Sequence, residues 1–139
     1  MSSDRLDNLA RNGQLKKEPP RADELAGLRR SGLARIADAQ RRDLSFESRF
    51  DLAYNAAHAL ALCALRRMGY RSEHRYLVFQ TLPHTVGLAA GQWRVLAKAH
   101  ETRNFAEYEG YLEQDERLLA DVLAATRALI AALPEDERE

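Results

Sequence analysis

The stretch from His100 to Tyr111, HETRNFAEYEGY, carries the residues whose types and spacing best suit chemistry. On a helix, Arg103 and Glu107 lie four positions apart on one face, and Asn104 and Tyr108 form a second such pair. A guanidinium held by a carboxylate offers several donors in a fixed geometry, which suits recognition of a phosphate or a nucleotide. The same pair also suits plain bracing between helices, and the residue types alone favour that role.

A second group of polar residues lies in the Ala-rich run from Ser45 to Met68. Its apolar residues recur every three to four positions, it contains no Gly or Pro, and Gly69 follows it, which predicts one helix. Tyr54, Asn55 and His58 fall on or near the apolar side of this helix. We therefore expect the most buried helix of the protein to carry polar groups that face the first group.

Three further long helices are expected, over Arg21 to Arg42, Gln92 to about Glu107, and Asp115 to Leu133. A short helix from Arg75 to Leu82 falls between the second and third long helices, and Phe105 should face inward. Short links between long helices make sequence neighbours antiparallel. The predicted fold class is all-α: an up-down-up-down four-helix bundle with a short extra helix between the second and third long helices.

The two ends of the chain differ from this middle part. Residues 1–20 are polar and end in two prolines, so we expect an N-terminal arm that is partly mobile. Residues 21–134 would form the bundle, and residues 135–139 an acidic C-terminal tail. The N-terminus has no apolar signal region and no stretch reaches transmembrane length, which predicts a cytoplasmic protein with no membrane partner.

Charge is unevenly distributed along a chain whose formal net charge is zero. Residues 1–103 hold 18 basic and 11 acidic residues, a net +7, whereas residues 104–139 hold 3 and 10, a net −7. The neutral total argues against a protein that coats nucleic acid generally. A basic body with an acidic last helix can pair within one bundle or head to tail in an oligomer.

Motifs of the familiar enzyme and metal classes are absent from the sequence. It has no glycine-rich phosphate loop, no Gly-x-Ser-x-Gly and no histidine pair with metal spacing. Cys63 is the only cysteine, so a cysteine-rich zinc site and an internal disulfide are excluded, and it is expected in the core. We therefore predict no metal and no cofactor.

The segment RNFAEYEG, with YNAAHALALCALRRMGY upstream, resembles the HEPN domain family of small four-helix bundles. The similarity in helix order covers roughly residues 22–133. The resemblance implies a homodimer, and a role in binding or cleaving RNA in prokaryotic toxin–antitoxin or defence systems. It also implies a possible partner, because other members accompany a small nucleotidyltransferase.

Active members of that family carry an Arg, usually followed by a polar residue, and then a His a few residues later. Arg103 and Asn104 match the beginning of this pattern, but Tyr108, Glu109 and Gly110 occupy the positions where the His would stand. The His is thought to act as the general acid and base, and tyrosine, with an unperturbed pKa near ~10, is a poor proton acceptor at neutral pH. Metal-independent RNA cleavage is therefore not expected, and the protein is interpreted as non-catalytic.

Three hypotheses follow from these residues. The preferred one is a non-catalytic, dimeric HEPN-like domain that binds a nucleotide, RNA or a nucleotidyltransferase partner through a site formed by seven residues: Tyr54, Asn55, His58, Arg103, Asn104, Glu107 and Tyr108. The alternative is an RNA endonuclease with a divergent active site, in which Arg103 would be the catalytic residue. A further alternative is a purely structural dimerisation module.

Overall fold

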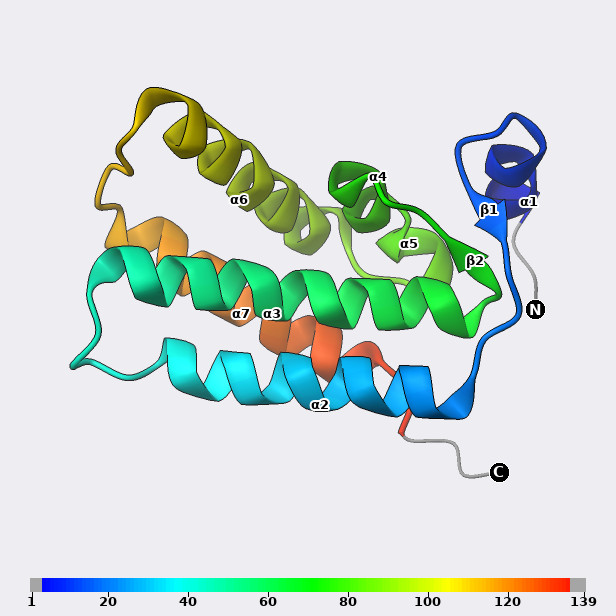
Figure 1. Cartoon of the computed structure of the whole chain (residues 1–139), viewed down its shortest axis with the longest axis horizontal. Helices are drawn as coiled ribbons and strands as arrows, with labels where there is room; N and C mark the ends of the chain where they lie inside the picture. Colours follow the sequence, from blue (N-terminus) through cyan, green and yellow to red (C-terminus); the bar gives the residue numbers. More distant parts are fainter. Residues whose placement is uncertain (1–3, 136–139) are drawn as a thin grey trace.

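The computed structural model describes residues 4–135, which form helices and one small sheet (Figure 1). The elements in chain order are α1 (Asp4–Arg11), β1 (Lys16–Lys17), α2 (Ala22–Ala39), α3 (Phe46–Arg67), β2 (Tyr70–Arg71), α4 (Arg75–Gln80), α5 (Leu82–Thr85), α6 (Ala90–Glu109) and α7 (Glu116–Ala132). The all-α prediction is confirmed, and each expected long helix lies within a few residues of its expected bounds.

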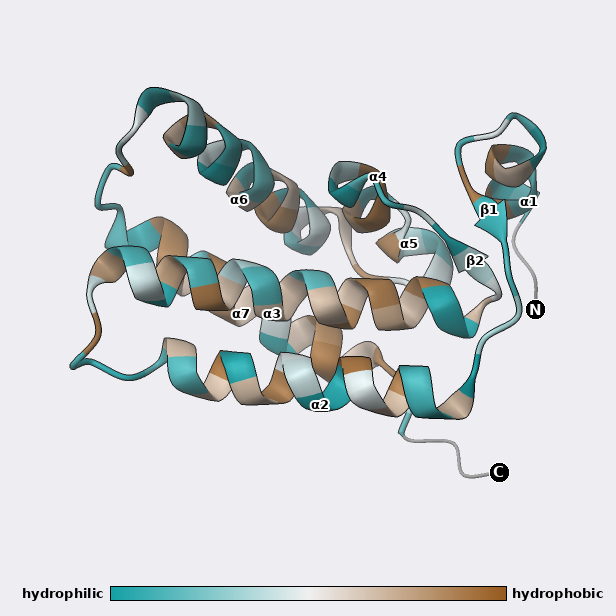
Figure 2. Ribbon diagram, in the orientation of Figure 1, coloured by the Kyte–Doolittle hydropathy of each residue, from teal (hydrophilic) through white to brown (hydrophobic). Residues whose placement is uncertain are grey.

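Helix α3 is the most buried helix, as the sequence predicts. The Ser45 hydroxyl accepts a hydrogen bond from the Ser48 N–H (3.1 Å), so the helix begins with a side-chain cap. Its Ala-rich surface lets α2 run alongside in the opposite direction, and α7 packs on it as well (Figure 1). Figure 2 shows hydrophobic residues recurring along α3 and α7, and these helices contribute most of the core, including the buried Cys63.

Helix α6 is packed only over its first part and diverges from α3 toward its C-terminal end (Figure 1). Leu96, Ala97 and Ala99 are buried, whereas Phe105 is 55% exposed. The expectation that Phe105 faces inward is therefore wrong. Apolar spacing indicates one helix face, but Arg103 is the residue that contacts α3 in this part of α6, whereas the Phe105 ring lies 6.3 Å from that of Tyr111.

The N-terminal segment lies on the body of the protein, which differs from the expected arm. Leu6, Leu9 and Leu15 are at most 4% exposed and belong to the hydrophobic core. Strand β1 pairs with β2 in antiparallel fashion, with Lys16 opposite Arg71. Leu6 and Leu9 are three positions apart, so the sequence does indicate a short helical turn over Asp4 to Ala10. The two-residue strand of lysines gives no strand signal, so the pairing of β1 with β2 was not predictable.

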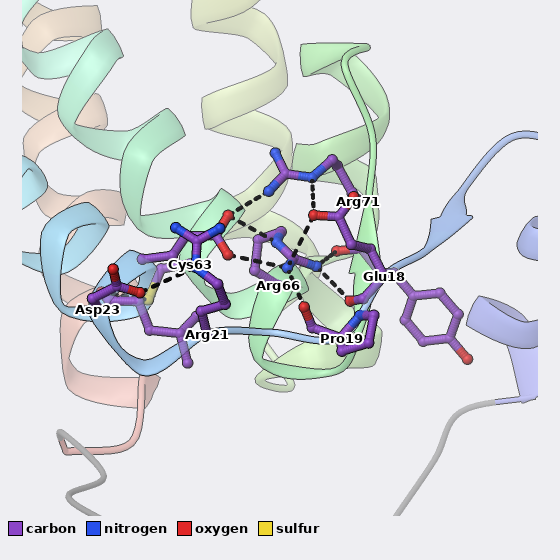
Figure 3. A network of polar contacts seen from close by, with 10 residues as sticks. Glu18, Pro19, Arg21, Asp23, Cys63, Arg66 and Arg71 are labelled. Carbon is purple, nitrogen blue, oxygen red and sulfur yellow. Dashed lines mark hydrogen bonds and ion pairs between the residues drawn. The ribbon is translucent and has the colours of Figure 1, made fainter.

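A buried arginine fastens this segment to the end of α3 (Figure 3). Arg66 has no exposed surface and donates to the carbonyls of Glu18 (2.8 Å), Pro19 (2.9 Å) and Tyr70 (3.2 Å). Its two remaining N–H groups donate to the two carboxylate oxygens of Glu24, both at 3.0 Å. All five guanidinium donors are thus satisfied, which is the condition for burying such a charge.

The C-terminal helix α7 also begins with a cap, because the Asp115 carboxylate accepts from the Leu118 N–H (2.9 Å). The expected acidic tail lies outside the described residues, apart from Glu135. Within residues 4–135, none of the helices combines the length and the apolar character needed to cross a membrane.

Candidate functional site

Arg103 projects from the C-terminal half of α6 toward α3. Its Nε donates to Asp51 Oδ1 (2.7 Å), and its Nη1 lies 3.7 Å from the Glu107 carboxylate. The guanidinium carbon sits 5.1 Å from the centroid of the Tyr54 ring, close enough for a cation–π contact. The side chain is still 32% exposed, so Arg103 is held across the two helices and yet remains accessible to a ligand.

His100 joins this arrangement one helical turn before Arg103. Its Nδ1 lies 2.9 Å from the Tyr54 hydroxyl oxygen, and its Nε2 lies 3.0 Å from the amide nitrogen of Asn104. With the Asn104 amide donating to Nε2, the neutral imidazole donates its Nδ1 proton to the Tyr54 oxygen. The three side chains therefore form a continuous hydrogen-bonded row beside the guanidinium of Arg103.

A second guanidinium reaches Tyr54 from the short helix α4. The Arg75 guanidinium carbon lies 5.5 Å from the Tyr54 ring centroid, and Nη1 donates to Asn55 Oδ1 (3.0 Å). The Asn55 amide in turn donates to the backbone carbonyl of Asp51 (2.9 Å). We call Tyr54 and the five side chains around it, Asn55, Arg75, His100, Arg103 and Asn104, the Tyr54 cluster.

Two histidines, His100 in the Tyr54 cluster and His58 beside it, have lowered pKa values. Burial lowers the pKa of His100, and the charges of Arg75 and Arg103 lower it further. Burial also lowers the pKa of His58 to about 4, with additional effects from Arg75 and His100. The charge of Glu101 acts in the opposite direction on His100, and both imidazoles are neutral at pH 7.

The structure brings together four of the residues that the sequence places in the site: Tyr54, Asn55, Arg103 and Asn104. Glu107 lies at the edge, with 69% of its side chain exposed. His58 lies nearby, with its ring centroid 6.1 Å from that of Phe79, a ring that also contacts Tyr54. Tyr108 stands apart, because it is 90% exposed.

Sequence reasoning did not place Asp51, Arg75 and His100 in the site. Asp51 lies three positions before Tyr54, and His100 three positions before Arg103, so helical spacing was a usable signal for both. Arg75 comes from a different helix, and its distance from Tyr54 in the sequence carries no such signal.

A groove with a volume of about 420 Å³ lies on the other side of Arg103, between the start of α3 and the end of α6. The charged residues that line it besides Arg103 are all acidic: Glu47, Asp51 and Glu107. An anion would be repelled there, so the basic face for a phosphate is the side with Arg75 and His100. Among the described residues, no three His, Cys, Asp or Glu side chains are grouped closely enough to hold a metal ion.

Compared with models of known protein families, with curated proteins and with solved structures, the chain has no significant match. The described part of the chain is mostly helical, and it carries a hydrogen-bonded cluster with two arginines around one buried tyrosine.

Proposed function

We propose that this chain is a non-catalytic HEPN-like domain, a dimeric up-down-up-down four-helix bundle, that binds the phosphates of RNA or of a nucleotide at the Tyr54 cluster. The order of α2, α3, α6 and α7, with α4 and α5 between the second and third long helices, supports the fold assignment. The homodimer, a nucleotidyltransferase partner and a toxin–antitoxin or defence setting rest on the resemblance of RNFAEYEG and its upstream helix to that family.

One observation carries the proposal: two guanidiniums, from Arg75 and Arg103, flank the ring of Tyr54 and both lower the pKa of His100. Guanidinium groups match the geometry of phosphate oxygens and hold them through paired donors. The ring of Tyr76 lies 5.9 Å from His100 and is 36% exposed, so it offers a surface on which a base can stack. Single-stranded RNA or a mononucleotide fits this combination.

Asp51 provides the sharpest test, because it occupies one edge of Arg103. A bound phosphate has to share the guanidinium with this carboxylate, so Asp51→Asn should tighten binding while Arg103→Ala and Arg75→Ala weaken it. Losing a hydrogen bond to a charged group costs about 1.5–3 kcal/mol, so each arginine variant should bind roughly tenfold or more weakly. The measurement is fluorescence anisotropy with labelled single-stranded RNA at two salt concentrations.

The matched control is Arg94→Ala, which removes an exposed arginine from the first turns of the same helix α6. It should change the affinity little. Equal affinities in all variants, together with a lower melting temperature for Arg103→Ala, would instead make the Arg103–Asp51 pair a structural brace and favour the dimerisation module.

A second candidate function, metal-independent RNA cleavage, is favoured by the position of His100. The family histidine expected after Arg103 is missing, but His100 lies one turn before Arg103 and is neutral at pH 7. Once a substrate displaces the Asn104 amide from Nε2, the neutral imidazole can accept the proton of a ribose 2′-hydroxyl at that nitrogen while Arg103 stabilises charge on the phosphate. Cleavage in EDTA that disappears in both His100→Gln and Arg103→Ala would establish the enzyme. Intact RNA in a denaturing gel would leave the binding function.

A further inference from the structure

A second concavity lies away from the Tyr54 cluster, where the end of α2, the start of α3 and α7 from Glu116 to Arg127 meet. Its volume is about 560 Å³, within the range of small-molecule sites. Three arginines line it: Arg42 after α2, Arg49 on α3 and Arg127 on α7. We call this concavity the arginine pocket. The proposed RNA site does not use any of its residues.

Two of these arginines are held in place by neighbours. Arg127 Nη2 donates to Gln40 Oε1 (2.8 Å), which ties α7 to the end of α2. Arg49 donates from both terminal nitrogens to the Glu116 carboxylate (3.2 and 2.9 Å) and from Nε to the carbonyl of Leu44 (3.3 Å). These contacts fix the positions of the two guanidiniums without a ligand, which reduces the entropy lost on binding.

Arg42 differs from the other two. It is exposed, and within residues 4–135 it makes no hydrogen bond or ion pair. Arg42 and Glu116 line the same pocket. The hydrogen bonds from Arg49 and Gln114 are the main cause that lowers the pKa of Glu116, and the charge of Arg42 adds to this lowering. Its donors are therefore available at the mouth of the pocket.

The charge balance and the apolar wall define what the arginine pocket fits. Three guanidiniums face one carboxylate, that of Glu116, so the lining has a net charge of +2. The half-buried Leu123 and the exposed Ala120 supply an apolar wall on α7, next to Leu119, which is 2% exposed. An inorganic anion alone would leave that wall uncovered, whereas an oxyanion attached to an apolar or ring-shaped body would contact both parts.

We propose that the arginine pocket binds a phosphorylated small organic molecule, with its phosphate on Arg42 and Arg127 and its organic part against Leu119 and Leu123. Arg49 would add a donor when its pairing with Glu116 loosens. The proposal stands whether or not the Tyr54 cluster binds RNA, because no side chain is shared.

The test is isothermal titration calorimetry of the full chain with 1-naphthyl phosphate, inorganic phosphate and 1-naphthol. We expect 1-naphthyl phosphate to bind more tightly than either of its two parts. Arg42→Gln and Arg127→Gln should each weaken binding on the order of tenfold, because each removes hydrogen bonds to a charged group. Glu116→Gln should tighten it, since the competing carboxylate is lost and Arg49 is released.

Two controls separate this site from the rest of the surface. Arg35→Gln removes an exposed arginine from α2 outside the pocket, and Arg103→Ala disables the proposed RNA site; neither should change the affinity for 1-naphthyl phosphate. Absence of binding by the wild type at millimolar ligand would overturn the proposal. So would unchanged affinity in Arg42→Gln and Arg127→Gln, or 1-naphthol binding as tightly as its phosphate.

Discussion

His58 shows how the surroundings of one residue set its chemistry. The side chain sits on α3 beside the edge of the Phe79 ring, and burial is the main cause that lowers its pKa from 6.5 to about 4. The charges of Arg75 and His100 act in the same direction. The same buried, cationic surroundings that would attract a phosphate therefore oppose protonation of this histidine.

This shift makes the stability of the protein depend on pH. Below pH 6.5 the unfolded chain binds a proton at His58, whereas the folded chain does not until the pH approaches 4. The free energy of unfolding should therefore fall as the pH is lowered from 6.5 to 4, by on the order of 2–3 kcal/mol from this residue. Urea unfolding at several pH values measures the effect.

The matched variants for this experiment are His58→Gln and His84→Gln. His58→Gln removes the titrating group, so its stability should change less over this pH range, while the exposed His84 can be replaced without altering the wild-type slope. Equal slopes in all three proteins would show that His58 is not the group responsible.

The sequence identified part of the candidate site because helical spacing relates residues within one helix. It brought Arg103 and Asn104 together on α6, and Tyr54 and Asn55 on α3, as components of one site. It did not reveal Arg75, because contacts between helices depend on the tilt and rotation of each helix. Packing of α4 against α3 and α6 decides that its first residue reaches Tyr54.

At the scale of elements, the closest packing is between α2 and α3, and Gly32 makes it possible. A Cβ atom at this position would lie 2.5 Å from Leu60 Cγ and 2.8 Å from Leu60 Cδ2. Leu60 has no exposed surface, so it has no free space into which to move. Gly27 lies one and a half turns earlier on α2, where a Cβ would meet only the flexible end of Arg30, at 3.7 Å.

These two glycines allow a matched pair of substitutions. Gly27→Ala should stabilise the protein by up to about 1 kcal/mol, because alanine has the higher helix propensity and meets no obstacle. Gly32→Ala gains the same propensity but forces α2 away from α3, and such overpacking costs about 1–3 kcal/mol, so the net effect should be destabilising. Thermal unfolding of both variants measures the difference. Equal stabilisation by the two alanines would contradict the close contact.

The long helices were predictable because their signals are local: apolar spacing, the Ser45 cap, and Gly110, which ends α6 with a positive φ of 88°. The β1–β2 pairing was not, because it joins residues more than 50 positions apart through strands of two residues. Phe105 is a third case. It fits the apolar spacing of α6, but its side chain is exposed.

At the scale of the whole molecule, charge remains divided between the basic body and the acidic end. Within the described residues, two ion pairs join the two parts: Arg49 with Glu116, and Arg103 with Glu107. The acidic residues after position 103 that the structure describes are exposed: Glu107, Glu109, Glu113, Asp115, Glu116, Asp121 and Glu135. A head-to-tail contact between copies stays a prediction from the charge distribution along the sequence.

Hydrogen bonds and ion pairs also join the N-terminal segment to the rest of the protein. Tyr70 donates its hydroxyl proton to the Asp7 carboxylate, and this hydrogen bond is the main cause that raises the pKa of Tyr70 to about 12. Arg71 donates to Glu18 Oε2 (3.1 Å) and to Glu24. Together with Arg66, these contacts tie residues before α2 to the end of α3, so the segment should unfold with the body and not before it.

Replacing one leucine of α1 tests whether the segment is part of the cooperative unit. Leu6 has no exposed surface, so Leu6→Ala should lower the free energy of unfolding by about 2–5 kcal/mol, the usual cost of such a change in a core. A mobile arm would give no such loss. Arg5→Ala, at the adjacent exposed position, is the control and should stay within about 0.5 kcal/mol of the wild type.

Urea unfolding followed by helical circular dichroism should show a single transition for both variants. An unchanged midpoint for Leu6→Ala would mean that α1 is not docked on the body in solution.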